Sequence, residues 1–169
     1  MISRIHLVLT AFSLAMAGTT AEQCDNFADR ARIVFVCEHG AAKSVIAAAY
    51  FNKIAAERGL RERAIYRGAS PQPELSVATL NGLREDGVAV PGSKPGPITA
   101  DDVSSATYIF AIGCSLPSHA ASSGKADSWD DVPEVSNGYA ASRDAIKRHV
   151  ERLIATAKAL NNSSSGTAA

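Results

Sequence analysis

An unbroken apolar run at residues 33–36 ends in Cys37, and five mostly small residues separate this cysteine from Lys43, Ser44 and a helix-forming stretch. A short continuous apolar run is typical of a strand that is buried on both faces. A tight loop from such a strand into a helix lies at the helix N-terminus, where backbone N–H groups have no partner and point toward any anion. The segment therefore predicts an α/β chain with an oxyanion site after its first strand.

Cys37 is the candidate nucleophile of this site. The positive end of a helix favours the thiolate form of a nearby cysteine, and Lys43 adds a full positive charge at the edge of the loop. The alternative is a buried core cysteine at a strand end, because free cysteine is among the most buried residue types. The rest of the chain decides between the two.

Apolar runs and helical periodicity alternate along that remainder. Strands are expected at 33–36, 65–69, 88–90 and 108–113, and longer helices at 45–58, 75–86 and 144–160. Thr99 and Asp102 resemble a capping box that starts one or two further helical turns. This order predicts an α/β three-layer sandwich, a four-stranded parallel sheet flanked by helices. Ligands of such sheets bind beyond the carboxyl ends of the strands, where Cys37 falls.

Several blocks resemble, in chain order, the low-molecular-weight protein tyrosine phosphatases and the thioredoxin-coupled arsenate reductases that share their fold. Cys37 through Ser44 resembles the signature Cys-x5-Arg-Ser, with lysine in place of arginine. Residues 66–71 resemble Ser-Ala-Gly-Thr-x-Pro, residues 94–103 resemble a segment with Ser-Lys-Pro-Leu-Thr, and residues 108–114 resemble a strand ending in Gly-Cys. The resemblance covers the chain from around Arg32 to Leu160.

The resemblance implies roles for the loop residues. Cys37 would attack phosphorus or arsenic, Ser44 would hydrogen-bond the thiolate, and Lys43 would stand where the family has its arginine. The substrate oxyanion would be bound by the loop residues Glu38, His39, Gly40, Ala41 and Ala42. Lysine is a point charge on a flexible stem, whereas arginine is a planar fork that holds two oxygens, so altered chemistry is expected.

A second set of roles concerns the general acid that protonates the leaving oxygen. The family takes it from an Asp-Pro motif, which this chain lacks; Asp130, Asp131 and Glu134 are the carboxylates in the matching block. The alignment favours Glu134, Asp131 stays a candidate, and a solvated acidic loop is the alternative. The tyrosines that follow the family's acid are also missing, and Tyr139 lies too far along to replace them, so phosphotyrosine specificity is not expected.

Cys114 occupies the position of the first resolving cysteine in the reductases, which makes it a possible redox residue. The partner four residues later is Ser118, although Cys24 is a spare thiol. A disulfide between Cys37 and Cys114, or one with Cys24, is one hypothesis, and an inert core residue at the strand end is the other. His39 likewise either contacts the anion or is merely exposed in the loop.

The amino-acid composition of the chain limits the classes of partner that can be expected. The chain has 169 residues, enough for one domain, and 17 basic and 17 acidic residues without a run of either sign. This balance favours neither nucleic-acid binding nor a sustained membrane-surface interaction. Four scattered histidines and no Cys-x2-Cys pair indicate no metal site, and the expected chemistry needs no cofactor.

The N-terminus has the pattern of a secretory signal peptide at residues 1–21, with Arg4, an apolar core at 7–18 and small residues at two cleavage patterns. A membrane anchor is the alternative, but a span needs roughly 20 apolar residues. Cleavage predicts a periplasmic or secreted protein without stable membrane insertion. Residues 22–31 would be an extension, 32–160 the phosphatase-like domain, and 161–169 a disordered polar tail.

Three functions remain open at this point. The first is an exported phosphatase that hydrolyses a phosphate monoester through a phosphocysteine. The second is an arsenate reductase on the same loop, completed by Cys114 or an external thiol reductant. The third is an oxyanion-binding module that kept the fold and lost turnover, which the Lys43 exchange and the missing Asp-Pro favour.

Overall fold

The computed structural model describes residues 32–165, and side chains as far as residue 157. The predicted signal peptide (1–21), the extension (22–31) and residues 166–169 lie outside the described residues. None of the helices in the described part is long and apolar enough to cross a membrane.

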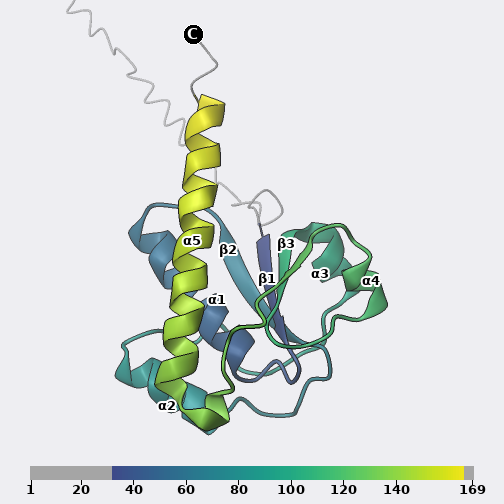
Figure 1. The fold of residues 1–169 in the computed structure, drawn as a ribbon, viewed down its shortest axis with the longest axis vertical. Coiled ribbons are helices and arrows are strands. Elements are labelled where there is room, and N and C mark those ends of the chain that lie inside the picture. The colour runs from purple at the N-terminus through teal and green to yellow at the C-terminus, as the bar shows by residue number, and fades with distance from the viewer. Residues whose placement is uncertain (1–31, 166–169) are drawn as a thin grey trace, which may run out of the picture.

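Four parallel strands form the sheet in the order β2-β1-β3-β4, which confirms the predicted fold class (Figure 1). The strands are β1 (Arg32–Cys37), β2 (Arg63–Gly68), β3 (Ala106–Ala111) and β4 (Ala126–Ser128). On one face lie α1 (Lys43–Glu57), α2 (Val77–Glu85) and α5 (Tyr139–Ser165). On the other lie α3 (Ala100–Ser105) and α4 (Ser118–Ala121), and a 3₁₀ turn, η2 (Val135–Asn137), precedes α5.

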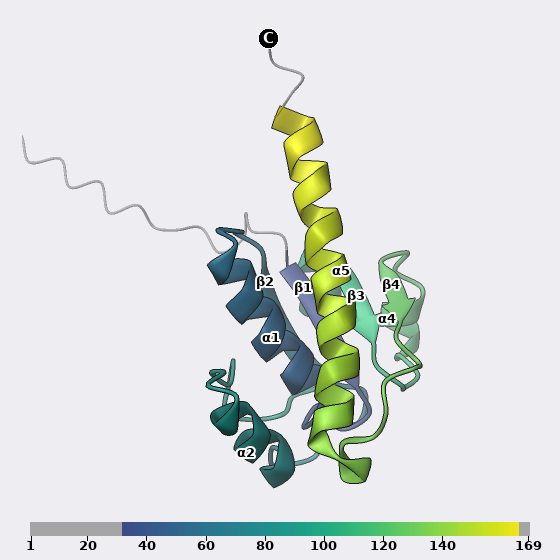
Figure 2. The same cartoon turned by 60° about the vertical axis from the view of Figure 1, so that its left-hand side comes forward.

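The central position of β1 in the sheet explains why its sequence is an unbroken apolar run. Alternate side chains of a strand point to opposite faces of the sheet. Ile33 and Phe35 pack into the larger core under α1 and α5, whereas Val34 and Val36 pack into the smaller core under α3 and α4. Figure 2 shows α1 and α5 side by side over β1. A strand with helices on both faces has no position that favours a polar side chain, which explains why the run is apolar throughout.

The prediction of a strand at residues 88–90 is wrong. The backbone N–H of Val88 donates to the Leu83 carbonyl at 2.8 Å, which closes the end of α2, and Pro91 follows without an N–H for a sheet ladder. The fourth strand is instead β4, which the sequence reading missed. Its three residues are all exposed, so they carry no apolar pattern that marks a strand.

Helix boundaries also differ from those expected. The capping box at Thr99 is confirmed, since both reciprocal hydrogen bonds with Asp102 are present. On α2 the apolar spacing of the sequence would place Val77 on the buried face with Leu80 and Leu83, and this expectation is wrong because Val77 is 71% exposed. The last helix starts at Tyr139 and continues to Ser165, five residues into the predicted disordered tail. Neither proline nor glycine occurs between Tyr139 and Gly166, so nothing in the chain stops the helix earlier.

Candidate active site

The loop after β1 lies at the point where the strand order reverses. The chain passes from β1 to β2 on one side and later returns to pair β3 with the other side. Such a reversal leaves a crevice at the carboxyl ends of the two strands. Cys37 ends β1 in this crevice and is only 3% exposed.

The loop turns its carbonyl groups outward. The carbonyls of Cys37, Glu38, His39 and Ala41 accept hydrogen bonds from backbone N–H groups of the segment that follows β2, at 2.8–3.2 Å. Within residues 32–165, no backbone N–H group from Glu38 to Ser44 donates to another backbone group. Outward carbonyls with unpaired amides form a concave anion-binding nest, and the start of α1 adds its own positive end.

Gly40 makes this loop geometry possible. Its φ of +62° lies in the left-handed region, and a Cβ at this position would stand 2.7 Å from the backbone nitrogen of Gly68. The loop therefore packs against the end of β2 with no room for a side chain. Gly40 itself does not line the cavity in front of Cys37.

We expect Gly40→Ala to lower the free energy of unfolding by about 2 kcal/mol or more, because left-handed strain of about 1–2 kcal/mol adds to the clash with Gly68. Urea unfolding measures the change. Gly59→Ala is the matched control, since Gly59 has φ +68° but a Cβ there would meet nothing within 4 Å. Equal losses in both variants would show that the contact with Gly68 does not constrain the loop.

Cys37 is hydrogen-bonded to a side chain at the start of α1. Its Sγ lies 3.1 Å from the Oγ of Ser44, which is fully buried in the first turn of that helix. The geometry is that of a hydroxyl able to donate to a thiolate. Ser44 therefore stands where the resemblance places a partner of the nucleophile.

Lys43 and Glu134 form an ion pair in the cavity at Cys37. The Nζ of Lys43 lies 2.6 Å from Oε1 of Glu134, and their side chains are 6% and 64% exposed. Gly113, which follows β3, leaves room for the end of the Lys43 side chain, because a Cβ at this position would stand 2.7 Å from the lysine Nζ. Gly113 belongs to the Gly-Cys match in the sequence but is not among the predicted site residues.

Glu134 is held over the cavity by anchored neighbours. Trp129 packs against Phe35 and Phe110, with ring centroids 5.2 and 4.9 Å apart. Farther along the segment, Val132 and Val135 are buried, and the hydroxyl of the buried Ser142 donates to the Pro133 carbonyl at 2.9 Å. Glu134 thus projects from a backbone fixed on both sides, although its own side chain is exposed.

Asp131, the other candidate acid, does not reach the cavity. Its carboxylate accepts a hydrogen bond from Nε2 of His149 at 2.6 Å. This hydrogen bond holds the pKa of Asp131 below its usual range, so the group stays ionised and is a poor proton donor. Asp130 accepts a hydrogen bond from Ser128 instead. The structure therefore places Glu134, and not Asp131, in the cavity that Cys37 lines.

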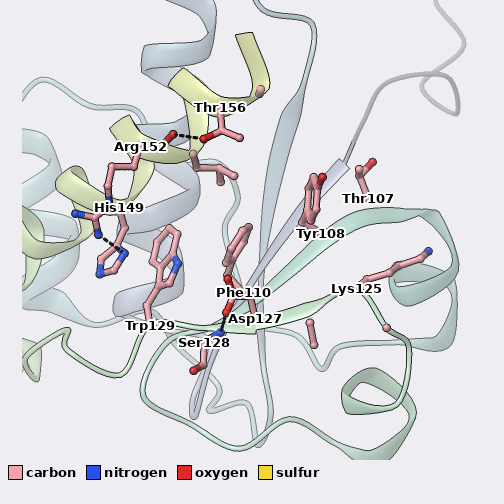
Figure 3. Close-up of a pocket in the computed structure, with 14 residues that line it drawn as sticks. Thr107, Tyr108, Phe110, Lys125, Asp127, Ser128, Trp129, His149, Arg152 and Thr156 are labelled. Atoms are coloured by element: carbon pink, nitrogen blue, oxygen red, sulfur yellow. Dashed lines mark hydrogen bonds between the residues drawn. The ribbon is translucent and has the colours of Figure 1, made fainter. Parts of the chain in front are cut away.

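His149 borders a second cavity, of about 670 Å³, that shares no residue with the cavity at Cys37. Figure 3 shows it between β3, β4 and α5, with Trp129 stacked on His149 at 4.6 Å and Arg152 bonded to the same histidine. Neither Cys37 nor Cys114 lines it. Trp129, which precedes the segment that carries Glu134, forms part of its wall.

The cavity in front of Cys37 has a volume of about 600 Å³. The predicted loop residues line it, except Gly40 and Ser44. Other lining residues were not predicted from the sequence to belong to the site. The lining residues are Cys37, Glu38, His39, Ala41, Ala42, Lys43, Gln72, Ser76, Ala78, Gly113, Glu134, Val135 and Ser136. None is a phenylalanine, tyrosine or tryptophan. Of the missed residues only Ser76 had a signal in the sequence, since it is the N-cap of α2.

Tyr139 has a structural role instead. Its hydroxyl donates to Asp86 at 2.8 Å, where Tyr50 and Arg143 also bind, so one carboxylate links α1, α2 and α5. Its ring lies against Gly82, where a Cβ would overlap it. These contacts explain why Tyr139 does not line the cavity in front of Cys37.

Cys114 is a free thiol, as is Cys37. Its Sγ–H points to the Val36 carbonyl at 3.6 Å, and burial, with a smaller contribution from the charge of Cys37, raises its pKa to about 11. A thiol of this pKa is protonated at neutral pH and attacks a disulfide or thioester slowly. Cys24 lies outside the described residues. No group of three or more histidine, cysteine or carboxylate side chains in the described part is placed to hold a metal ion.

Comparisons with known proteins agree with this geometry. A family model described as low molecular weight phosphotyrosine protein phosphatase matches residues 32–164. No curated protein sequence matches the chain.

Solved structures with the same fold are distant in sequence. YfkJ from Bacillus subtilis has a TM-score of 0.65 and 20% identity over 76% of this chain and 95% of its own. A mutant of YwlE from the same organism has a TM-score of 0.68 and 22% identity over 76% and 99%. A thioredoxin-dependent arsenate reductase from Corynebacterium glutamicum has a TM-score of 0.63 and 22% identity over 75% and 61%.

Proposed function

Because this chain belongs to the low molecular weight phosphotyrosine protein phosphatase family, we propose that it hydrolyses a phosphate monoester through a phosphocysteine on Cys37. The observation that carries the proposal is the convergence of three groups in one cavity. They are the buried thiol of Cys37, which is hydrogen-bonded to Ser44, the unpaired backbone amides of the loop, and the carboxylate of Glu134, which is ion-paired with Lys43.

In the first step the thiolate of Cys37 attacks phosphorus while the phosphorus–oxygen bond to the leaving group breaks. Glu134 gives its proton to the departing oxygen, so an alcohol leaves. The amides from Glu38 to Ser44 and the ammonium of Lys43 bind the three equatorial oxygens. Preorganised donors of this kind contribute roughly 3–4 kcal/mol each to the transition state.

In the second step water attacks the phosphocysteine. Glu134, now ionised, accepts a proton from the water, the sulfur–phosphorus bond breaks, and inorganic phosphate leaves with the thiolate restored. Neither step needs a metal or an organic cofactor. Lys43 holds one oxygen where arginine would hold two, so we expect slower turnover than an arginine enzyme would give.

The cavity walls favour a substrate other than phosphotyrosine. The residues opposite the loop are small or polar, among them Gln72, Ser76 and Ser136, and the lining has no phenylalanine, tyrosine or tryptophan ring to stack on a phenol. A small phosphomonoester fits this lining. Assaying the purified protein with an aryl phosphate and with aliphatic phosphates, under reducing conditions, tests both the reaction and the preference.

Arsenate reduction is the second candidate, supported by the Gly113-Cys114 match and by the arsenate reductase among the fold neighbours. Cys37 would bind arsenic with loss of water, and a second thiol would attack the Cys37 sulfur, which forms a disulfide and releases arsenite. The raised pKa of Cys114 makes an external thiol the better reductant. Failure with both phosphate esters and arsenate would favour the oxyanion-binding module.

We also propose export, with the protein periplasmic or secreted. The mature chain should begin at Gly18 or Glu22, because the apolar stretch at 7–18 is too short to span a membrane and small residues follow it. Mass spectrometry of protein from its native host measures the mature N-terminus. An intact chain starting at Met1 would contradict cleavage.

A further inference from the structure

The ion pair between Lys43 and Glu134 conflicts with the tasks that the proposed reaction gives to these two residues. Lys43 has to bind the substrate anion, and Glu134 has to carry a proton for the leaving group. In the structure the two side chains bind each other at 2.6 Å. A carboxylate in an ion pair carries no proton to donate, so the resting pair is not yet the catalytic arrangement.

Burial shows which partner can leave. The side chain of Lys43 is 6% exposed, and a buried ammonium without a counter-ion is strongly unfavourable. The side chain of Glu134 is 64% exposed, so water can solvate its carboxylate after the pair breaks. Lys43 therefore keeps its place and exchanges one anion for another, whereas Glu134 moves.

An oxyanion on the loop amides supplies the replacement counter-ion. Once it binds Lys43, the carboxylate of Glu134 has lost its cation and faces a new negative charge. Both changes favour uptake of a proton from solvent. A proton on the carboxyl group is what the first chemical step consumes.

We propose that Glu134 is an internal anion that occupies Lys43 in the resting protein, and that a bound oxyanion displaces it and thereby loads it with a proton. This inference rests on the proposed function, because it concerns the general acid of that reaction. It makes the acid available only in the complex, and it makes oxyanion binding tighter as the pH falls.

Other titratable groups share the cavity and have to be separated from Glu134. They are Cys37, Glu38 and His39 on the loop; the thiol of Cys114 lies outside the lining, against the Val36 carbonyl. The walls from α2 and η2 contribute Ser76, Ala78, Val135 and Ser136, which do not titrate in the neutral range. His39 bonds the Ser70 carbonyl at 3.3 Å, which directs its Nδ1 toward the segment after β2.

The experiment measures sulfate binding to the purified protein by isothermal titration calorimetry. Sulfate stays a dianion across the neutral range, so it contributes no proton of its own. The Cys37→Ser background removes the thiol and all turnover. Titrations in two buffers with different ionisation enthalpies give the number of protons taken up per bound sulfate.

Two variants in that background form a matched pair. Glu134→Gln removes the internal anion, and Asp131→Asn removes a carboxylate of the same segment that is also 64% exposed but binds His149. We expect proton uptake that grows as the pH is lowered from 7 to 5, both without further substitution and with Asp131→Asn, and none that grows in this way with Glu134→Gln. At neutral pH we expect Glu134→Gln to bind sulfate about tenfold more tightly.

Three results would overturn the proposal. Proton uptake that persists in Glu134→Gln would assign the proton to another group such as His39. Equal tightening in both variants would reduce the effect to net charge, and no proton uptake in the background protein would show that the pair survives binding. Because sulfate is not turned over, none of these results depends on the phosphatase reaction, which the aryl phosphate assay tests separately.

Discussion

Replacing Cys37 with serine is expected to abolish hydrolysis of an aryl phosphate. In the proposed mechanism the thiolate is the attacking group, and a hydroxyl at the same place needs a base to remove its proton. Ser44 at 3.1 Å is itself a hydroxyl and cannot serve as that base. Steady-state release of the phenol, with the folded state of the variant checked by thermal unfolding, measures the loss.

Cys114→Ser is the control for this variant. Its thiol lies outside the lining of the cavity and points to the Val36 carbonyl, so phosphatase activity should stay near wild type. Activity of Cys37→Ser close to that of the wild type would place the nucleophile elsewhere. Loss of activity in Cys114→Ser alone would favour a reaction that needs two thiols.

Replacing Lys43 with alanine is expected to lower kcat/KM for an aryl phosphate more than tenfold, which corresponds to about 1.4 kcal/mol of lost transition-state binding. The ammonium brings a full positive charge to the cavity, and its contribution grows as charge develops on the transferred group. Steady-state kinetics on the folded variant measures the effect.

Lys43→Arg should act in the opposite direction and raise activity or anion affinity, because its fork can hold two equatorial oxygens at once. The risk is steric: Gly113 leaves only a narrow passage beside the Nζ, and Glu38 lies on the same loop. Equal rates for alanine, lysine and arginine would place the position outside the chemistry and favour the oxyanion-binding module.

Much of the fold could be predicted because buried positions are occupied by apolar residues whose spacing differs between strands and helices. The apolar run before Cys37 belongs to a strand with a helical layer on each face, and the helix after the loop keeps its apolar spacing. The three exposed residues of β4 carry no such pattern, and Val88 in the apolar stretch 88–90 closes the end of α2 instead. Short edge elements depend on tertiary pairing, which local sequence does not encode.

The loop residues of the site could be predicted because they are contiguous. Their roles stay predictions, although the structure gathers Cys37, Ser44 and Lys43 with Glu134, which is 91 positions from Lys43 in the chain. The choice of Glu134 over Asp131 needed the structure, since only tertiary packing shows that His149 holds the aspartate. Likewise, the close approach of Gly113 to the Lys43 ammonium depends on the pairing of β1 with β3. These strands are distant in the chain, so the local sequence does not predict this contact.

The most direct test of the central claim is to trap the covalent intermediate. The protein is mixed with an aryl phosphate, denatured at alkaline pH within the first turnover, digested at alkaline pH, and analysed by mass spectrometry. We expect one added phosphoryl group on the peptide that contains Cys37, labile to hydrolysis and absent from the Cys37→Ser protein. Turnover without a phosphorylated Cys37 peptide, or a phosphoryl group on another residue, would contradict the phosphocysteine mechanism.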